Sequence, residues 1–97
     1  MYNFDITSEN ERFHIALLLD CYGNMLTEKQ RSAVELYFQD DLSLSEISAL
    51  HHITRQAVQD RIRQGVKTLQ QLDEKLNFLK RIAEYEAKIA KLEQEIQ

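Results

Sequence analysis

This chain has almost none of the residues that end helices or build tight turns. Its 97 residues contain no proline, and its two glycines are Gly23 and Gly65. A fold rich in β-strands needs many such residues, because they adopt the backbone angles that a strand reversal requires. The sequence therefore predicts an all-α fold. At this length we expect one small helical domain with an appendage.

Residues that cap the first backbone N–H groups of a helix mark four predicted helix starts. The first helix is expected over Glu9 to Tyr22, stopped by Gly23-Asn24, and the second ends at Asp40-Asp41. The capping pairs are Ser8 with Glu11, Thr27 with Gln30 and Ser43 with Glu46, and Thr54 is the fourth cap.

Apolar residues recur at helical spacing behind each cap, which indicates the face that each helix buries. Phe13, Tyr37 and Phe38 are not interleaved with basic residues, so we expect them in the core rather than stacked on bases. The predicted faces are Phe13, Ala16, Leu17 and Cys21 widened by Ile15, Leu18 and Leu19; then Val34, Leu36, Tyr37 and Phe38; then Leu44, Ile47, Leu50 and His51; and finally Val58, Ile62, Val66 and Leu69.

Residues 43–64 have the layout of a helix-turn-helix unit: a capped short helix, a tight turn and a second capped helix. Ile53 and Val58 occupy the two positions of a hydrophobic staple around the second cap. In such a unit the first helix packs across the second, so Ile47 and Leu50 are expected to meet its apolar face.

The exposed start of the second helix carries side chains that suit nucleic acid. Arginine and glutamine can hydrogen-bond the edges of guanine and adenine, and basic residues further along suit phosphate. Arg55, Arg61 and Arg63 are expected to carry whatever nucleic-acid affinity the protein has, whereas Asp60 would repel phosphate. The predicted nucleic-acid-binding residues are Thr54, Arg55, Gln56, Gln59, Arg61, Arg63 and Lys67.

The charge of the chain is uneven, although its formal net value is −4. Residues 1–54 hold three basic and nine acidic residues, a net of −6, and residues 83–97 have a net of −2. Residues 55–82 hold seven basic and three acidic residues, a net of +4. The basic surplus therefore lies on and just after the second helix of the predicted unit, where a phosphate-binding surface belongs.

Residues 26–69, "LTEKQRSAVELYFQDDLSLSEISALHHITRQAVQDRIRQGVKTL", resemble the fourth region of bacterial sigma factors in their spacing and in the Thr54-Arg55 pair. His52 departs from that pattern, because glycine is usual at its turn position. A closer resemblance, through "LLLDCYGNMLTEKQR" and "SLSEISALHHITRQAVQDRIR", is to the YlxM proteins. These are helix-turn-helix proteins of Gram-positive bacteria encoded beside genes of the signal recognition particle. The resemblance implies a regulatory or accessory role in that targeting pathway.

Two functions are compatible with these patterns. One is a nucleic-acid-binding regulatory protein whose partner is DNA or the RNA of the signal recognition particle. The other is a protein-interaction module that docks on signal recognition particle proteins without binding DNA. Their response to salt separates them, because a complex driven by phosphate contacts weakens steeply as salt rises.

Other classes of function find little support. The sequence has no glycine-rich phosphate loop, nucleophile elbow or zinc-protease motif, so we expect no enzyme and no cofactor. His51 and His52 are adjacent rather than four residues apart, and with Cys21 they predict no metal site. The single cysteine suits a reducing compartment. The first ten residues do not look like a signal peptide, and the longest apolar run, Ile15 to Leu19, is too short for a bilayer. We expect a cytoplasmic protein that does not insert into membranes.

The last third of the chain, Leu69 to Ile96, has an apolar residue every three or four positions. We divide the chain into a helix-turn-helix domain, residues 1–72, and a helical extension, residues 73–97. The fourth helix can run straight on, or turn near Asp73 and fold back to give a monomer. A straight helix would be about 60 Å long and would project, so we predict a homodimer or other homo-oligomer. The predicted contact residues are Leu76, Leu79, Ile82, Ile89 and Leu92.

Overall fold

The computed structural model describes residues 9–96 and contains only helices and their connections over that range. The predicted all-α fold is therefore confirmed. The elements are α1 (Glu9–Tyr22), a 3-10 turn η1 (Gly23–Met25), α2 (Glu28–Phe38), α3 (Leu44–His51), α4 (Arg55–Leu76) and α5 (Phe78–Ile96). None of the helices in this range is long and apolar enough to cross a membrane.

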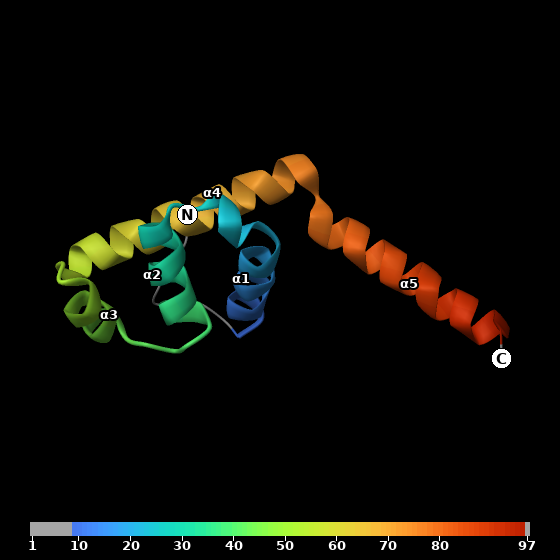
Figure 1. The fold of residues 1–97 in the computed structure, drawn as a ribbon, viewed down its shortest axis with the longest axis horizontal. Coiled ribbons are helices and arrows are strands. Elements are labelled where there is room, and N and C mark those ends of the chain that lie inside the picture. The colour runs from blue at the N-terminus through green and yellow to red at the C-terminus, as the bar shows by residue number, and fades with distance from the viewer. Residues whose placement is uncertain (1–8, 97) are drawn as a thin grey trace.

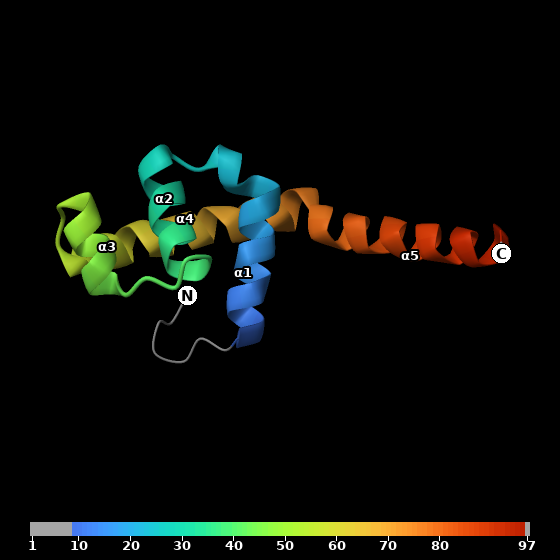
Figure 2. The same cartoon turned by 60° about the horizontal axis from the view of Figure 1, so that its bottom comes forward.

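Helix α4 is the helix against which the three preceding helices all pack. Helices α3, α2 and α1 pack against it one after another, from its first residues towards its last (Figure 1). Helix α5 then leaves this body and projects away from it, as both ribbon views show (Figure 2). The result is an elongated molecule with principal extents of 56 × 24 × 22 Å.

The core lies where α1, α2 and α3 meet α4. The predicted buried face of α4 is confirmed, because Val58, Ile62, Val66 and Leu69 are all buried. Gly65 shares this face and marks the closest approach of α2, since a Cβ placed there would lie 2.7 Å from Val34 Cγ2. The remaining core residues, in the other helices and at Leu26 before α2, are Ile15, Leu18, Leu19, Tyr22, Leu26, Ala33, Val34, Phe38 and Ile47.

Side-chain caps define the starts of α2, α3 and α4 as the sequence predicts. The Thr27 hydroxyl accepts from the Gln30 N–H, and the Thr54 hydroxyl accepts from the Ala57 N–H at 3.0 Å. Ser43 begins α3 with a complete capping box, in which the Glu46 carboxylate accepts in return from the Ser43 N–H. The remaining predicted capping residue, Ser8, lies outside the described residues.

The prediction for α1 was right about its bounds and about Ile15, Leu18 and Leu19, which are buried, but wrong about Phe13 and Leu17, which are exposed. Ile15, Leu18, Leu19 and Tyr22 point into the core, whereas Phe13 is 66% exposed. The continuous apolar run at residues 15–19 goes round the whole helix, so spacing alone permits two opposite buried faces. Only the packing of α1 against α2 and α4 selects one of them.

The fourth helix neither runs straight on nor breaks near Asp73, the two predicted alternatives, but ends between them. It passes Asp73 without a break and stops at Leu76, and Asn77 follows in the left-handed conformation with φ 56°. Asparagine tolerates this conformation better than most residues, so it can turn the chain between two helices. Helix α5 does not fold back onto the body, and it has no buried residue.

Tyr22 fixes the direction in which α5 leaves. Its buried hydroxyl donates to Asp73 Oδ1 at 2.7 Å and accepts from the Phe78 N–H at 3.0 Å. Its ring stacks on the ring of Phe78, with centroids 5.6 Å apart. One side chain of α1 thus joins the last turn of α4 to the first residue of α5.

Candidate nucleic-acid interface

Helices α3 and α4 form the predicted helix-turn-helix unit. Ile47 is fully buried against α4, where Val58 and Ile62 are also fully buried. Leu50, which was expected to share this contact, is 58% exposed, so that expectation was wrong. Residues three and four apart both lie on the side of Ile47, and the contacts with Ser32 and Arg61 show that His51 rather than Leu50 faces the other helices.

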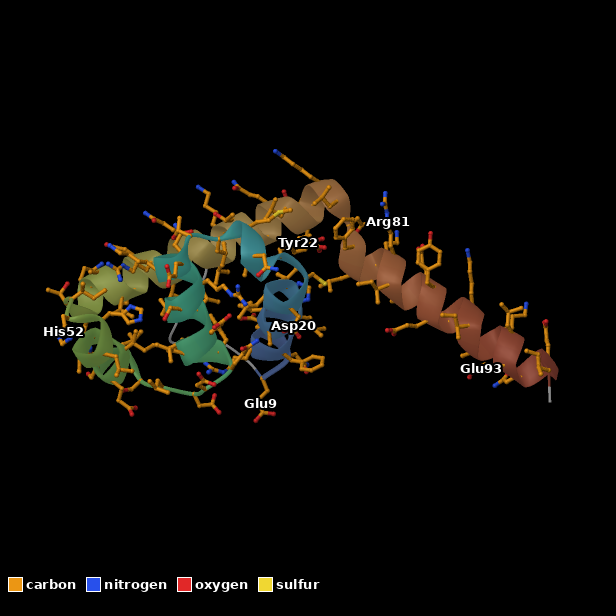
Figure 3. All side chains as sticks on the ribbon, in the orientation of Figure 1. Glu9, Asp20, Tyr22, His52, Arg81 and Glu93 are labelled. Atoms are coloured by element: carbon orange, nitrogen blue, oxygen red, sulfur yellow. The ribbon has the colours of Figure 1, made fainter. Side chains whose placement is uncertain are left out.

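The turn between the two helices is held by Ser48. The N–H groups of His52 and Ile53 both donate to the Ser48 carbonyl, and the Ser48 hydroxyl donates to the Ile53 carbonyl. His52 has φ 56°, the left-handed conformation that favours glycine. The turn lies at the end of the molecule farthest from α5, near the label of His52 in Figure 3.

Five of the seven predicted nucleic-acid-binding residues lie within one arc of α4. Successive helix residues are about 100° apart, so this arc covers about 120° and lies beside the buried face. We call these five the α4 polar arc. They are Arg55, Gln56, Gln59, Arg63 and Lys67.

The other two predicted residues have structural contacts. Thr54 caps α4 through its hydroxyl. Arg61 lies about 200° round the helix from Arg63 and is partly buried. Its Nη1 is 3.3 Å from His51 Nδ1, while His51 Nε2 is 3.1 Å from the Ser32 hydroxyl. Arg61 therefore points towards α2 and α3, away from the α4 polar arc.

His51 connects three helices in its neutral form. Burial, followed by the nearby positive charge of Arg61, lowers the pKa of His51. Arginine has only donors, so Nδ1 accepts from Arg61 and Nε2 carries the proton towards Ser32. The sequence offered only the position of His51 on the packed side of α3. Its contacts with Ser32 and Arg61 depend on how the three helices meet.

Asp60 lies beside the α4 polar arc and is engaged by two of its members. Its Oδ1 accepts from Gln56 Nε2 at 3.2 Å and is 3.7 Å from Arg63 Nη1. The carboxylate therefore offsets part of the positive charge that would face phosphate. A pair this exposed contributes about 0–1 kcal/mol, so a phosphate can compete for Arg63.

Residues 9–97 match the model of a family described as "Putative helix-turn-helix protein, YlxM / p13 like". The chain belongs to this family. The YlxM resemblance predicted from the sequence is thus confirmed, and the family description agrees with the unit formed by α3 and α4. The description is of a helix-turn-helix family rather than an enzyme family.

Relatives in several bacteria, each named UPF0122 protein, are similar to this member of the YlxM/p13-like family. The protein of Clostridium botulinum (strain Alaska E43 / Type E3) is 46% identical over 71 residues, covering 73% of this chain and 65% of its own length. The protein of Desulforamulus reducens is 43% identical over 75 residues, which cover 76% of this chain and 64% of its own length. The protein of Bacillus cereus (strain AH187) is 44% identical over 77 residues, which cover 79% of this chain and 70% of its own length. The chain therefore spans slightly less than two thirds of the clostridial relatives it matches.

Proposed function

We propose that this YlxM/p13-like protein is a non-enzymatic regulatory protein that binds DNA through the start of α4. The observation that carries the proposal is the α4 polar arc, which brings Arg55, Gln56 and Gln59 to the exposed start of the second helix of a helix-turn-helix unit. In that unit the first turns of the second helix are the part that reaches base edges in the major groove.

The members of the arc have different roles in this proposal. Arg55, Gln56 and Gln59 lie nearest the groove and hydrogen-bond base edges. Arg63 and Lys67, one and two turns further along, contact phosphates and fix the register of the helix on the duplex. Arg61 instead supports the unit through His51 and is expected to matter for its stability rather than for contact with DNA.

The acidic net charge of the chain favours binding of two protein copies to one DNA site. The whole chain is acidic, with a net charge of −4, and Asp60 offsets part of the basic arc. Repulsion of this kind weakens the binding of one copy, whereas two linked copies raise the effective concentration of the second contact. We therefore propose that the DNA-binding form is a homodimer. The resemblance to YlxM proteins supports a regulatory role linked to the signal recognition particle pathway.

A pair of matched variants tests the binding surface. Arg63→Ala with Lys67→Ala removes the two positive charges of the arc that contact phosphates in this proposal, and Lys80→Ala with Lys91→Ala removes two exposed ones from α5. Anisotropy of a labelled mixed-sequence duplex, titrated at several salt concentrations, gives the slope of log affinity against log salt. Losing two phosphate contacts should lower the magnitude of that slope by about 2 in the arc variant only. Equal slopes in both variants and the parent would refute the proposal.

A gain of affinity provides an independent check. Asp60→Asn removes the carboxylate beside the arc and should tighten binding about threefold, from the Coulomb energy of one charge several ångströms from a phosphate in water. Glu74→Gln, an exposed residue on α4 well past the arc, is the control and should change affinity less. If Asp60→Asn binds DNA no more tightly than Glu74→Gln, the major groove does not lie beside Asp60 as proposed.

A second candidate function is docking on protein components of the signal recognition particle. The observation in its favour is Leu50, an apolar side chain 58% exposed on α3, close to the turn. Capture of particle proteins from cytoplasmic extract, with and without nuclease, separates the two functions. A partner lost on nuclease treatment supports nucleic-acid binding. A particle protein retained after nuclease, and lost in Leu50→Ser, supports docking.

A further inference from the structure

Helix α5 carries an apolar stripe that is left exposed by the rest of residues 9–96. The stripe residues follow each other at steps of three, four, three and four, and each is 44–85% exposed. They are Ile82, Tyr85, Ile89, Leu92 and Ile96. Leu76 and Leu79, also among the predicted oligomer-contact residues, pack against the core of the same chain and lie outside the stripe.

The body cannot reach this stripe. Its contact with α5 ends in the first turn, where Phe78 stacks on Tyr22 and Leu79 packs against the core. The hydrogen bonds from Tyr22 to Asp73 and Phe78 hold α5 in its projecting direction. The whole of α5 is about 28 Å long at 1.5 Å per residue, so none of the other described residues, 9–77, reaches along it to cover the stripe.

The spacing of the stripe is that of a coiled-coil seam, and its residue types indicate the number of strands. In heptad terms every a position is isoleucine, namely Ile82, Ile89 and Ile96. The d positions along the stripe are Tyr85 and Leu92. In parallel coiled coils, β-branched residues at a combined with leucine at d, as at Leu92, favour two strands.

Charged residues on the two flanks of the stripe indicate the orientation of the pair. On one flank, the g positions hold Arg81, Lys88 and Glu95; on the other, Glu86 and Glu93 hold the e positions. Figure 3 shows Arg81 and Glu93 leaving opposite sides of α5. In a parallel pair each g residue faces the e residue five positions later on the other helix, so Arg81 meets Glu86 and Lys88 meets Glu93, each twice by symmetry.

An antiparallel pair has the opposite consequence. There e positions face e positions and g positions face g positions, so the carboxylates of Glu86 and Glu93 would face one another. Like charges at that distance repel each other, and the attraction of the parallel arrangement would be lost. Although Arg81 and Glu95 would attract each other across the g positions of an antiparallel pair, the repulsion between the e positions and the loss of the Arg81–Glu86 and Lys88–Glu93 pairs favour the parallel orientation.

We propose that α5 pairs with α5 of a second copy of this chain in a parallel, in-register, two-stranded coiled coil. Both bodies then lie at the same end of the coil, related by a two-fold axis along it. This specifies the geometry of the homodimer put forward with the proposed function. It does not require nucleic acid, so it can fail while DNA binding holds, and the reverse.

Charge-swap variants test the g–e pairing by sedimentation equilibrium. Arg81→Glu with Lys88→Glu makes both flanks acidic, and Glu86→Lys with Glu93→Lys makes both basic. In each, four attractions become repulsions, which should weaken the dimer about a hundredfold. The fourfold variant that carries all these changes again has opposite charges on its flanks and should dimerise like the parent. Double variants that dimerise as tightly as the parent would overturn the proposal. So would a fourfold variant whose dimer affinity does not return to that of the parent.

Single cysteines test the orientation and register. In a Cys21→Ser background, Ile82→Cys and Ile96→Cys each face the same residue of the second copy in a parallel pair, and both should form a disulfide-linked dimer on mild oxidation. Ala87→Cys, on the side of α5 away from the stripe, is the control and should not. Circular dichroism confirms that each variant stays helical. Helical Ile82→Cys and Ile96→Cys proteins that link no faster than the control would overturn the parallel arrangement.

Discussion

The contact between α2 and α4 at Gly65 gives a prediction whose sign opposes the usual rule. Glycine in the interior of a helix is about 1 kcal/mol worse than alanine, so Gly65→Ala would ordinarily stabilise α4. A Cβ at this position, however, would lie 2.7 Å from Val34 Cγ2, and Val34 is itself fully buried. Overfilling a packed core usually costs about 1–3 kcal/mol.

The two terms together predict a net loss of stability. Subtracting the helix gain from the packing cost leaves Gly65→Ala destabilised by up to about 2 kcal/mol. At about 4–8 °C per kcal/mol for a domain of this size, the melting temperature should fall by several degrees. Thermal unfolding followed by circular dichroism measures this shift. Gln71→Ala, at an exposed position of the same helix, is the control and should change stability little.

A double-mutant cycle with Val34→Ala isolates the cause. Val34→Ala removes the atom that the new Cβ would meet, so in that background Gly65→Ala should stabilise the protein by about 1 kcal/mol. The coupling between the two changes should then be about 1–3 kcal/mol. A Gly65→Ala protein that melts higher than the parent, or a cycle without coupling, would refute the close approach of the two helices.

Two further predictions concern polar groups between helices. Tyr22→Phe removes the hydroxyl that is hydrogen-bonded to both the Phe78 N–H and Asp73. The free energy of unfolding, measured by urea titration, should fall by about 1–3 kcal/mol. A change within error would mean that the hydroxyl does not stabilise the junction between α4 and α5. The pKa of His51 is lowered in the folded state, so as pH falls the unfolded chain binds a proton at His51 before the folded protein does. The stability due to neutral His51 is therefore complete above the ordinary histidine pKa and is lost as pH falls below it. The parent should therefore lose more stability than His51→Gln between about pH 7 and pH 5, and equal losses would contradict a neutral His51 in contact with Arg61.

The sequence alone determined the features that depend on neighbours a few residues apart. A capping side chain needs only the N–H two or three residues later, so Thr27, Ser43 and Thr54 placed three helix starts correctly. The buried face of α4 was equally legible, because polar residues surround Val58, Ile62, Val66 and Leu69 and leave one possible face. Together these local signals also identified the helix-turn-helix unit.

Only the tertiary structure decided the features that depend on distant partners. Helix α1 has apolar residues all round, and α2 and α4 determine that Phe13 faces outward. Helix geometry alone places Arg61 about 200° round α4 from Arg63, but its contact with His51 of α3, which in turn contacts Ser32 of α2, depends on how the three helices pack. The chain turns at Asn77 rather than near Asp73, where Tyr22, more than fifty residues earlier, ties the two helices together. Spacing along the chain cannot predict such contacts, because each depends on where the other helices pack.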